Sequence, residues 1–188
     1  MTVIEPSHRR GKAVDDKILS AVIEEIEATG TLKIRVDAVA DRAGVNKTTI
    51  YRRYPERDEL VLSAVFELAQ VVLPIPDTGS LKDDLTTLAL GVSETVTSPI
   101  GQAILSASAD SPDFVDVRER YWRTRFEVAS VIIERAIERG ECREGVDGSA
   151  LLEVMVAPLH FRATQVGKEL TSDFIALQVG RLLNEVAL

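Results

Sequence analysis

Residues 36–60, VDAVADRAGVNKTTIYRRYPERDEL, decide how the first third of this chain folds. Apolar residues recur at helical spacing over 36–43 and predict a short helix there. Gly44 predicts the end of that helix, because glycine adopts the left-handed turn conformation that other residues resist. Asn46 is a good N-cap for a second short helix over 47–54. The stretch therefore predicts two short helices joined by a tight turn.

Further helices are expected on either side of this pair. Residues 1–12 read as a flexible arm, and apolar residues on one face predict a helix over 13–28. Pro55 cannot extend the second short helix, but it suits the turn that opens another helix over 57–72. We therefore expect one small helical domain over residues 13–72.

The rest of the chain, residues 73–188, reads as a larger helical domain. It begins with the proline-rich joint LPIPDTGS and continues as long apolar-periodic segments with clear punctuation. No convincing strand pattern occurs, so the fold class expected is all-α, with about nine helices. The helices expected here span about 81–97, 99–109, 112–139, 148–166 and 172–187, with caps at Ser80, Asp147 and Thr171 or Ser172.

Composition excludes several classes of protein. One cysteine, Cys142, forbids a disulfide within the chain, and with only two histidines a Cys/His zinc site is not expected. No stretch has the apolar length of a signal peptide or a membrane span. We expect a soluble, cytoplasmic protein with no membrane association, no metal and no cofactor.

The charge distribution differs sharply between the two parts of the chain. The net charge is −8, yet residues 1–60 carry eleven basic and eleven acidic residues, so the whole acidic surplus lies in 61–188. Residues 31–54 hold six basic and two acidic residues. Because salt screens charges beyond roughly 8 Å, the local field decides whether a surface attracts a phosphate backbone. The helix pair is therefore compatible with binding DNA.

Two short helices around a glycine-containing turn form the helix-turn-helix arrangement. Its second helix presents donors suited to phosphates and base edges, and a major groove about 12 Å wide accepts one helix. The whole segment closely resembles the DNA-binding segment of tetracycline-repressor (TetR) family regulators, in its A-G-V turn, T-x-Y spacing, Tyr54 and Arg57. A weaker resemblance, in IERAIERGECREGVDGSALLEVMVAPLHFR, is to the C-terminal domain of one branch of that family.

The resemblance implies a homodimeric repressor that binds a palindromic operator in double-stranded DNA and is released by a small-molecule effector. Thr49, Tyr51 and Arg57 match positions that commonly contact phosphates. The positions near the bases are matched by Lys47, Thr48 and Arg52. Arg35 stands where the family usually has a Thr or Ser cap, so that cap is lost and a phosphate contact replaces it.

Some residues admit a purely structural interpretation. Tyr51 is a core tyrosine in one interpretation, but Ile50 already points inward and Arg52 is adjacent, which favours phosphate contact. In the larger domain, Tyr121, Trp122 and Phe126 either line an apolar effector pocket or pack as ordinary core. His160 is a further pocket candidate, although a structural histidine satisfied by its neighbours is the favoured alternative.

Two other functions stay open at this point. The first alternative is a helical small-molecule-binding protein in which the DNA-binding head is vestigial. Thermal stabilisation by a ligand, without any affinity for DNA, would favour it. An enzyme is disfavoured, because no nucleophile is paired with a base and no catalytic residue, metal spacing or glycine-rich phosphate loop stands out. The apolar segment ALLEVMVAPLHF suggests a partner surface, which favours a homodimer through a four-helix contact.

Overall fold

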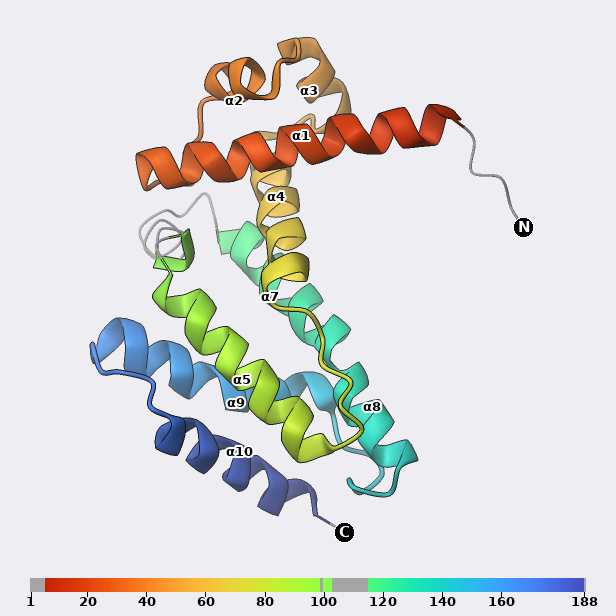
Figure 1. Ribbon diagram of the computed structural model, residues 1–188, viewed down its shortest axis with the longest axis vertical. Helices are drawn as coiled ribbons and strands as arrows, with labels where there is room; N and C mark the ends of the chain where they lie inside the picture. Colours follow the sequence, from red (N-terminus) through yellow and green to blue (C-terminus); the bar gives the residue numbers. More distant parts are fainter. Residues whose placement is uncertain (1–5, 99, 103–114, 188) are drawn as a thin grey trace. The chain divides into compact units, whose positions relative to one another are not determined.

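The structure is a computed structural model, and it describes residues 6–98, 100–102 and 115–187. The described residues form helices and no strand, which confirms the all-α fold class (Figure 1). The α-helices are α1 (Pro6–Thr29), α2 (Val36–Ala43), α3 (Lys47–Arg53), α4 (Arg57–Val72), α5 (Leu81–Thr97), α7 (Val115–Ala129), α8 (Val131–Glu138), α9 (Gly148–His160) and α10 (Ser172–Val186). None of them is long and apolar enough to cross a membrane.

The chain divides into two compact units, the first comprising Met1–Ala69 and Gln102–Val117 and the second comprising Gln70–Gly101 and Arg118–Leu188. The division falls inside α4, three residues before the boundary expected from the proline-rich joint. The assignment of 13–72 to DNA binding and of 73–188 to regulation and dimerisation stays a prediction.

In the first unit, α2 and α3 lie along one side of the long helix α1 (Figure 1). Ile18, Val22 and Ile26 face inward from α1 and are fully buried. Val39 of α2 and Ile50 of α3 are equally buried, so each short helix contributes its apolar side to one small core. Burial of these side chains, each worth about 1.5–3 kcal/mol, holds helices that are too short to be stable alone.

The flexible arm expected over residues 1–12 is wrong for residues 6–12, which form the first turns of α1. Pro6 is the first residue of α1, where its fixed φ suits a helix and its missing N–H leaves no hydrogen bond unmade. Arg9, Arg10 and Lys12 are also good helix formers. Residues 1–5 of the expected arm lie outside the described part of the chain.

In the second unit, α5, α8, α9 and α10 pack around a shared apolar core. Leu85, Ile132, Leu152 and Met155 are among its fully buried members. Three expected N-caps are confirmed by hydrogen bonds to backbone amides. The side chain of Ser80 accepts a hydrogen bond from the amide of Asp83, that of Asp147 from the amide of Ala150, and that of Thr171 from the amide of Phe174. Local capping therefore determined where these helices begin.

Two expected helices of this unit differ from the structure. The helix expected to run unbroken to Gly140 is interrupted at Ser130, which separates α7 from α8. Gly148, at the start of α9, approaches this break so closely that a Cβ on it would lie 3.0 Å from the Cβ of Ser130. The interruption thus accompanies a tertiary contact that local sequence does not encode.

The helix expected over 148–166 ends at His160 and is followed by a π-helical turn, Phe161–Gln165. Pro158 lies within the last turn of α9 and lacks an amide hydrogen, so it cannot donate the regular helical bond to the carbonyl four residues earlier. The helix expected over 99–109 lies outside the described residues except for 100–102, as does the expected start at 112.

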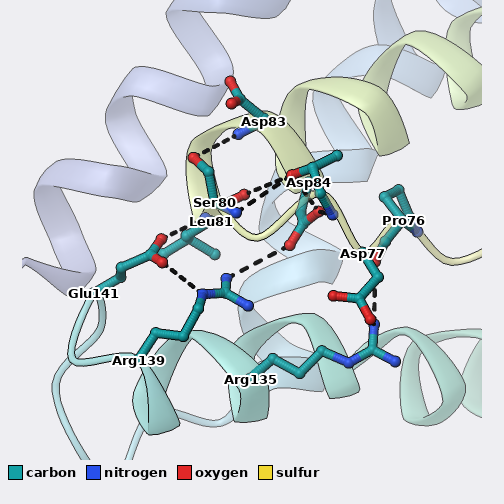
Figure 2. A network of polar contacts seen from close by, with 10 residues as sticks. Pro76, Asp77, Ser80, Leu81, Asp83, Asp84, Arg135, Arg139 and Glu141 are labelled. Carbon is teal, nitrogen blue, oxygen red and sulfur yellow. Dashed lines mark hydrogen bonds and ion pairs between the residues drawn. The ribbon is translucent and has the colours of Figure 1, made fainter.

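A polar network joins the beginning of α5 to the end of α8 (Figure 2). Asp84 is completely buried; its Oδ1 accepts hydrogen bonds from the amide and hydroxyl of Thr78, and its Oδ2 lies 3.6 Å from Arg139 Nη2. Arg139 also pairs with Glu141, whose other oxygen accepts the amide of Leu81 at 2.5 Å. The hydrogen bond from Arg139, and after it the bond from the Leu81 amide, lower the pKa of Glu141.

Candidate nucleic-acid interface and ligand pocket

The turn between α2 and α3 is built by backbone hydrogen bonds that require a left-handed residue. Gly44 has φ 64° and ψ 37°, and its amide bonds to the carbonyl of Asp41. The amide of Val45 bonds to the carbonyl of Ala40 at 3.0 Å. This paired arrangement is the Schellman motif, in which glycine avoids the Cβ strain of other residues. The glycine turn expected from the sequence is confirmed.

The cap of α3 is also confirmed. Asn46 Oδ1 accepts a hydrogen bond from the amide of Thr48 at 3.0 Å and from the Thr48 hydroxyl at 2.9 Å. The first turn of α3 contains no acidic residue, so no carboxylate of the helix itself offsets the partial positive charge at its N-terminus.

The side chains of α3 divide into a buried anchor and an exposed face. Ile50 is fully buried, whereas Tyr51 is 49% exposed and Arg52 is exposed. The interpretation of Tyr51 as a core tyrosine is therefore wrong. Thr48 is exposed and Thr49 is half-buried. Among the described residues, Arg52 has neither an ion pair nor a hydrogen bond, so its guanidinium is available to an external acceptor.

Three ion pairs attach the helix pair to α1, the longest of them at 3.9 Å between Arg42 Nη1 and Glu24 Oε2. Arg42 Nε of α2 lies 3.1 Å from Glu25 Oε2, and the Glu25 side chain is almost completely buried. Arg53 Nε, at the end of α3, lies 2.6 Å from Asp15 Oδ1. Arg53 thus serves to hold α3 in place, which leaves Arg52 as the exposed arginine of this helix.

The remaining predicted contacts surround α3. Lys47 forms an ion pair with Asp37 of α2, and both side chains are about half exposed. Arg35 occupies the position before α2 with an extended backbone and makes no side-chain cap, as the sequence predicted. Arg57 is half-buried in the first turn of α4, with Nε 3.3 Å from Asp58 Oδ1.

Tyr54 closes α3 and is half-buried, as expected for an anchor. Burial raises the pKa of its hydroxyl, and the negative charge of Asp15 adds to that rise. The hydroxyl is therefore neutral at ordinary pH and remains a hydrogen-bond donor.

The four predicted ligand residues of the larger unit form one aromatic cluster. Trp122 stacks with Phe126 at a centroid distance of 5.5 Å, and it meets Tyr121 and His160 edge-on at 5.2 and 5.0 Å. Burial lowers the pKa of His160 to about 4, and its Nδ1 atom is buried without a hydrogen-bond partner among the residues that the structure describes. His160 is therefore a neutral, incompletely satisfied histidine, contrary to the satisfied structural role that the sequence favoured.

An open pocket of about 440 Å³ lies beside this cluster. Trp122 and Phe126 contribute to its wall, whereas Tyr121 and His160 do not. Four carboxylates and one guanidinium surround the two rings; the polar and small lining residues are Glu119, Arg123, Glu127, Asp147, Ser149, Ala150 and Glu153. The sequence did not single out these residues, because they come from α7 and from the beginning of α9 with its cap, which only tertiary packing brings together.

Cys142, the lone cysteine, is buried in the core of the second unit, and burial raises the pKa of its thiol. A raised pKa disfavours the reactive thiolate. Within the described residues, no cluster of three or more histidine, cysteine or acidic side chains is placed to hold a metal.

Comparison with known proteins identifies the family. Residues 18–64 match the bacterial regulatory proteins of the tetR family, and residues 75–182 match the tetracyclin repressor-like C-terminal domain. This chain belongs to the TetR family. The helix-turn-helix lies within the first match, so the resemblance inferred from residues 36–60 is confirmed.

Relatives align over nearly the whole chain. The HTH-type transcriptional regulator AqdR of Rhodococcus erythropolis is 31% identical over 178 residues, which cover 93% of this chain and 86% of AqdR. The DNA-binding transcriptional repressor TetR of Mycobacteroides abscessus is 27% identical, with 95% and 94% covered. The crystal structure of the TetR-family regulator SCO0332 superposes with a TM-score of 0.77 at 27% identity, covering 93% of this chain and 99% of that one.

Proposed function

We propose that this TetR-family protein is a transcriptional repressor that inserts α3 into the major groove of a palindromic operator. The division of α3 into one buried and one exposed face carries this proposal. Ile50 anchors the helix while Thr48 and Arg52 face solvent, where base edges are within reach of a docked helix. Two relatives support the same function, because AqdR is an HTH-type transcriptional regulator and TetR is a DNA-binding transcriptional repressor.

The other predicted residues are assigned to the phosphate backbone. Tyr51 and Thr49 supply hydroxyl donors, and Lys47 and Arg57 supply positive charge beside α3. Arg35 lies at the start of α2, where its extended backbone presents an exposed side chain. Contacts of this kind fix the register of a protein on DNA without reading its sequence.

A homodimer fits both a palindromic site and the surface of the second unit. Val154, Phe161, Val166 and Leu177 are all large, exposed apolar side chains, and they belong to α9, the following π turn and its end, and α10. Exposed apolar surface of this kind is typical of a subunit interface. We assign these elements to a four-helix contact between two copies, and the effector to the second unit.

The function is tested with a duplex selected by this protein from a random DNA pool. Tyr51→Phe and Arg57→Ala are expected to weaken binding to all sequences, and Arg57→Ala lowers the log–log salt slope by about 0.9 per lost phosphate contact. Arg52→Ala is expected also to relax the base preference, by about 1–3 kcal/mol at its position. Failure to enrich any sequence at low salt contradicts the proposed function.

A further inference from the structure

Three charged side chains are almost completely buried among the described residues: Glu25, Asp84 and Arg125. Glu25 has Arg42 as its counter-ion at 3.1 Å, and Asp84 has Arg139 at 3.6 Å. Arg125 has no carboxylate within ion-pair distance in the part of the chain that the structure describes. Among the described residues, two of the three buried charges therefore have a counter-ion, and the third, a cation in the second unit, has none.

The guanidinium of Arg125 is only half used. Its side chain is 4% exposed, and Nη2 donates to the carbonyl of Leu73, at the start of the proline-rich joint. Nη1 is buried and has no hydrogen-bond partner within the described part of the chain. Tyr121 lies one helical turn earlier on α7, close enough to interact electrostatically with the cation. The hydrogen bond to Leu73 explains the position of Nη2, but it does not explain why Nη1 is buried.

A buried charge without a counter-ion is costly, because desolvation is not repaid by an ion pair. Burial accordingly lowers the pKa of Arg125, although the group stays protonated at ordinary pH. A methionine or leucine would fill the same space without this penalty. A charge kept under such conditions indicates a site whose partner comes from outside the chain.

We propose that Arg125 binds the carboxylate of a small aromatic acid, and that this anion is the effector. The carboxylate accepts a charge-assisted hydrogen bond from Nη1 of Arg125, and it supplies the missing negative charge. The aromatic part is assigned from Tyr121, which lies one helical turn before Arg125 and interacts with its guanidinium. This inference rests on the proposed function, because it names the chemistry of the effector.

The open 440 Å³ pocket is a different site from the one proposed. Arg125 does not line it, and its four carboxylates outnumber its single guanidinium. The negative field of this pocket repels anions and attracts cations. A ligand in the pocket should therefore be a cation, whereas a ligand at Arg125 should be an anion.

The test compares sodium benzoate with benzamide, its neutral counterpart of nearly the same shape. Thermal unfolding of the full-length protein is measured with 50 mM of each compound, at an ionic strength matched with sodium chloride. Wild type is compared with Arg125→Met, Arg125→Lys and Arg120→Met. Arg120 is an exposed arginine of the same helix and serves as the matched control.

We expect benzoate to raise the Tm of wild type and Arg120→Met, with benzamide and chloride giving smaller shifts. Arg125→Met should bind benzoate roughly tenfold to a hundredfold more weakly, the factor expected for one hydrogen bond to a charged group. Arg125→Lys retains the charge and should keep part of the response, which decides the matter if Arg125→Met does not fold.

Equal shifts with benzoate, benzamide and chloride overturn the inference, as does a benzoate response that survives in both Arg125 variants. Stabilisation by the cation benzylammonium alone, which points to the acidic pocket, overturns it as well. DNA selection is scored separately, so a protein that enriches an operator but ignores benzoate keeps the proposed function and loses only this assignment.

Discussion

The ion pair between Lys47 and Asp37 offers a direct test of how α3 meets DNA. Lys47 is the first residue of α3, and in the free protein its ammonium group is held by a carboxylate of α2. A phosphate oxygen competes with that carboxylate when DNA binds. Asp37→Asn removes the competitor while leaving Lys47 in place, so we expect tighter binding of the operator.

The size of the gain follows from exposure. Both side chains of the pair are about half exposed, and ion pairs of this kind contribute about 0.2–1 kcal/mol. Taking about 0.5 kcal/mol for each subunit, a dimer gains about 1 kcal/mol, which corresponds to roughly fivefold tighter binding. The gain should fade as salt rises, because screening weakens the attraction between Asp37 and Lys47 that only the wild type has to give up.

The assay is fluorescence anisotropy of a labelled operator duplex, titrated at 50, 150 and 300 mM salt. Asp41→Asn is the matched control, since it removes one exposed carboxylate from the same helix without releasing a lysine. If Asp41→Asn tightens binding as much as Asp37→Asn, general charge explains the effect. If Asp37→Asn leaves affinity unchanged or weakens it, Lys47 does not contact phosphate and its assignment is wrong.

Two further predictions concern stability. Gly44→Ala should lower the free energy of unfolding by about 1 kcal/mol, because φ 64° is strained for alanine although no atom lies near the added Cβ. Gly11→Ala, within α1, should raise the free energy of unfolding by about 0.5–1 kcal/mol. Urea unfolding measures both changes. Burial lowers the pKa of His160 from 6.5 to about 4, so the unfolded chain binds more protons between these values. Stability should therefore fall by about 2 kcal/mol from pH 7 to pH 4.5, and His160→Gln should lack that loss.

The sequence predicted the helix-turn-helix well because local chemistry determines it. Gly44, Asn46 and Pro55 each act within one turn of their own position, and α2 ends, α3 begins and α4 begins where these residues indicated. The N-caps Ser80 and Asp147 were equally local. Errors arose where the determining contact lies far along the chain, as at Ser130, where Gly148 packs closely.

The candidate site in the second unit was only partly predictable. Apolar and aromatic content singled out Trp122 and its neighbours, and the structure brings those rings together. The segment RERYWRTRF contains several arginines, and helical spacing alone does not tell which one is buried. The burial of Arg125 depends on the carbonyl of Leu73, 52 residues earlier. Pro158 was a local signal that the helix expected over 148–166 would be interrupted, because a proline disrupts the hydrogen bonds of its own helix.

The arrangement of α3 also bears on how operator preference diverges among relatives. Ile50, which is buried, and Arg53, which is half-buried and paired with Asp15, fix the helix, whereas Arg52 is exposed. Substitutions at Thr48 or Arg52 therefore change little of the folding energy. We expect the operator preference of such a DNA-binding unit to change through single substitutions, without compensating substitutions elsewhere in the fold.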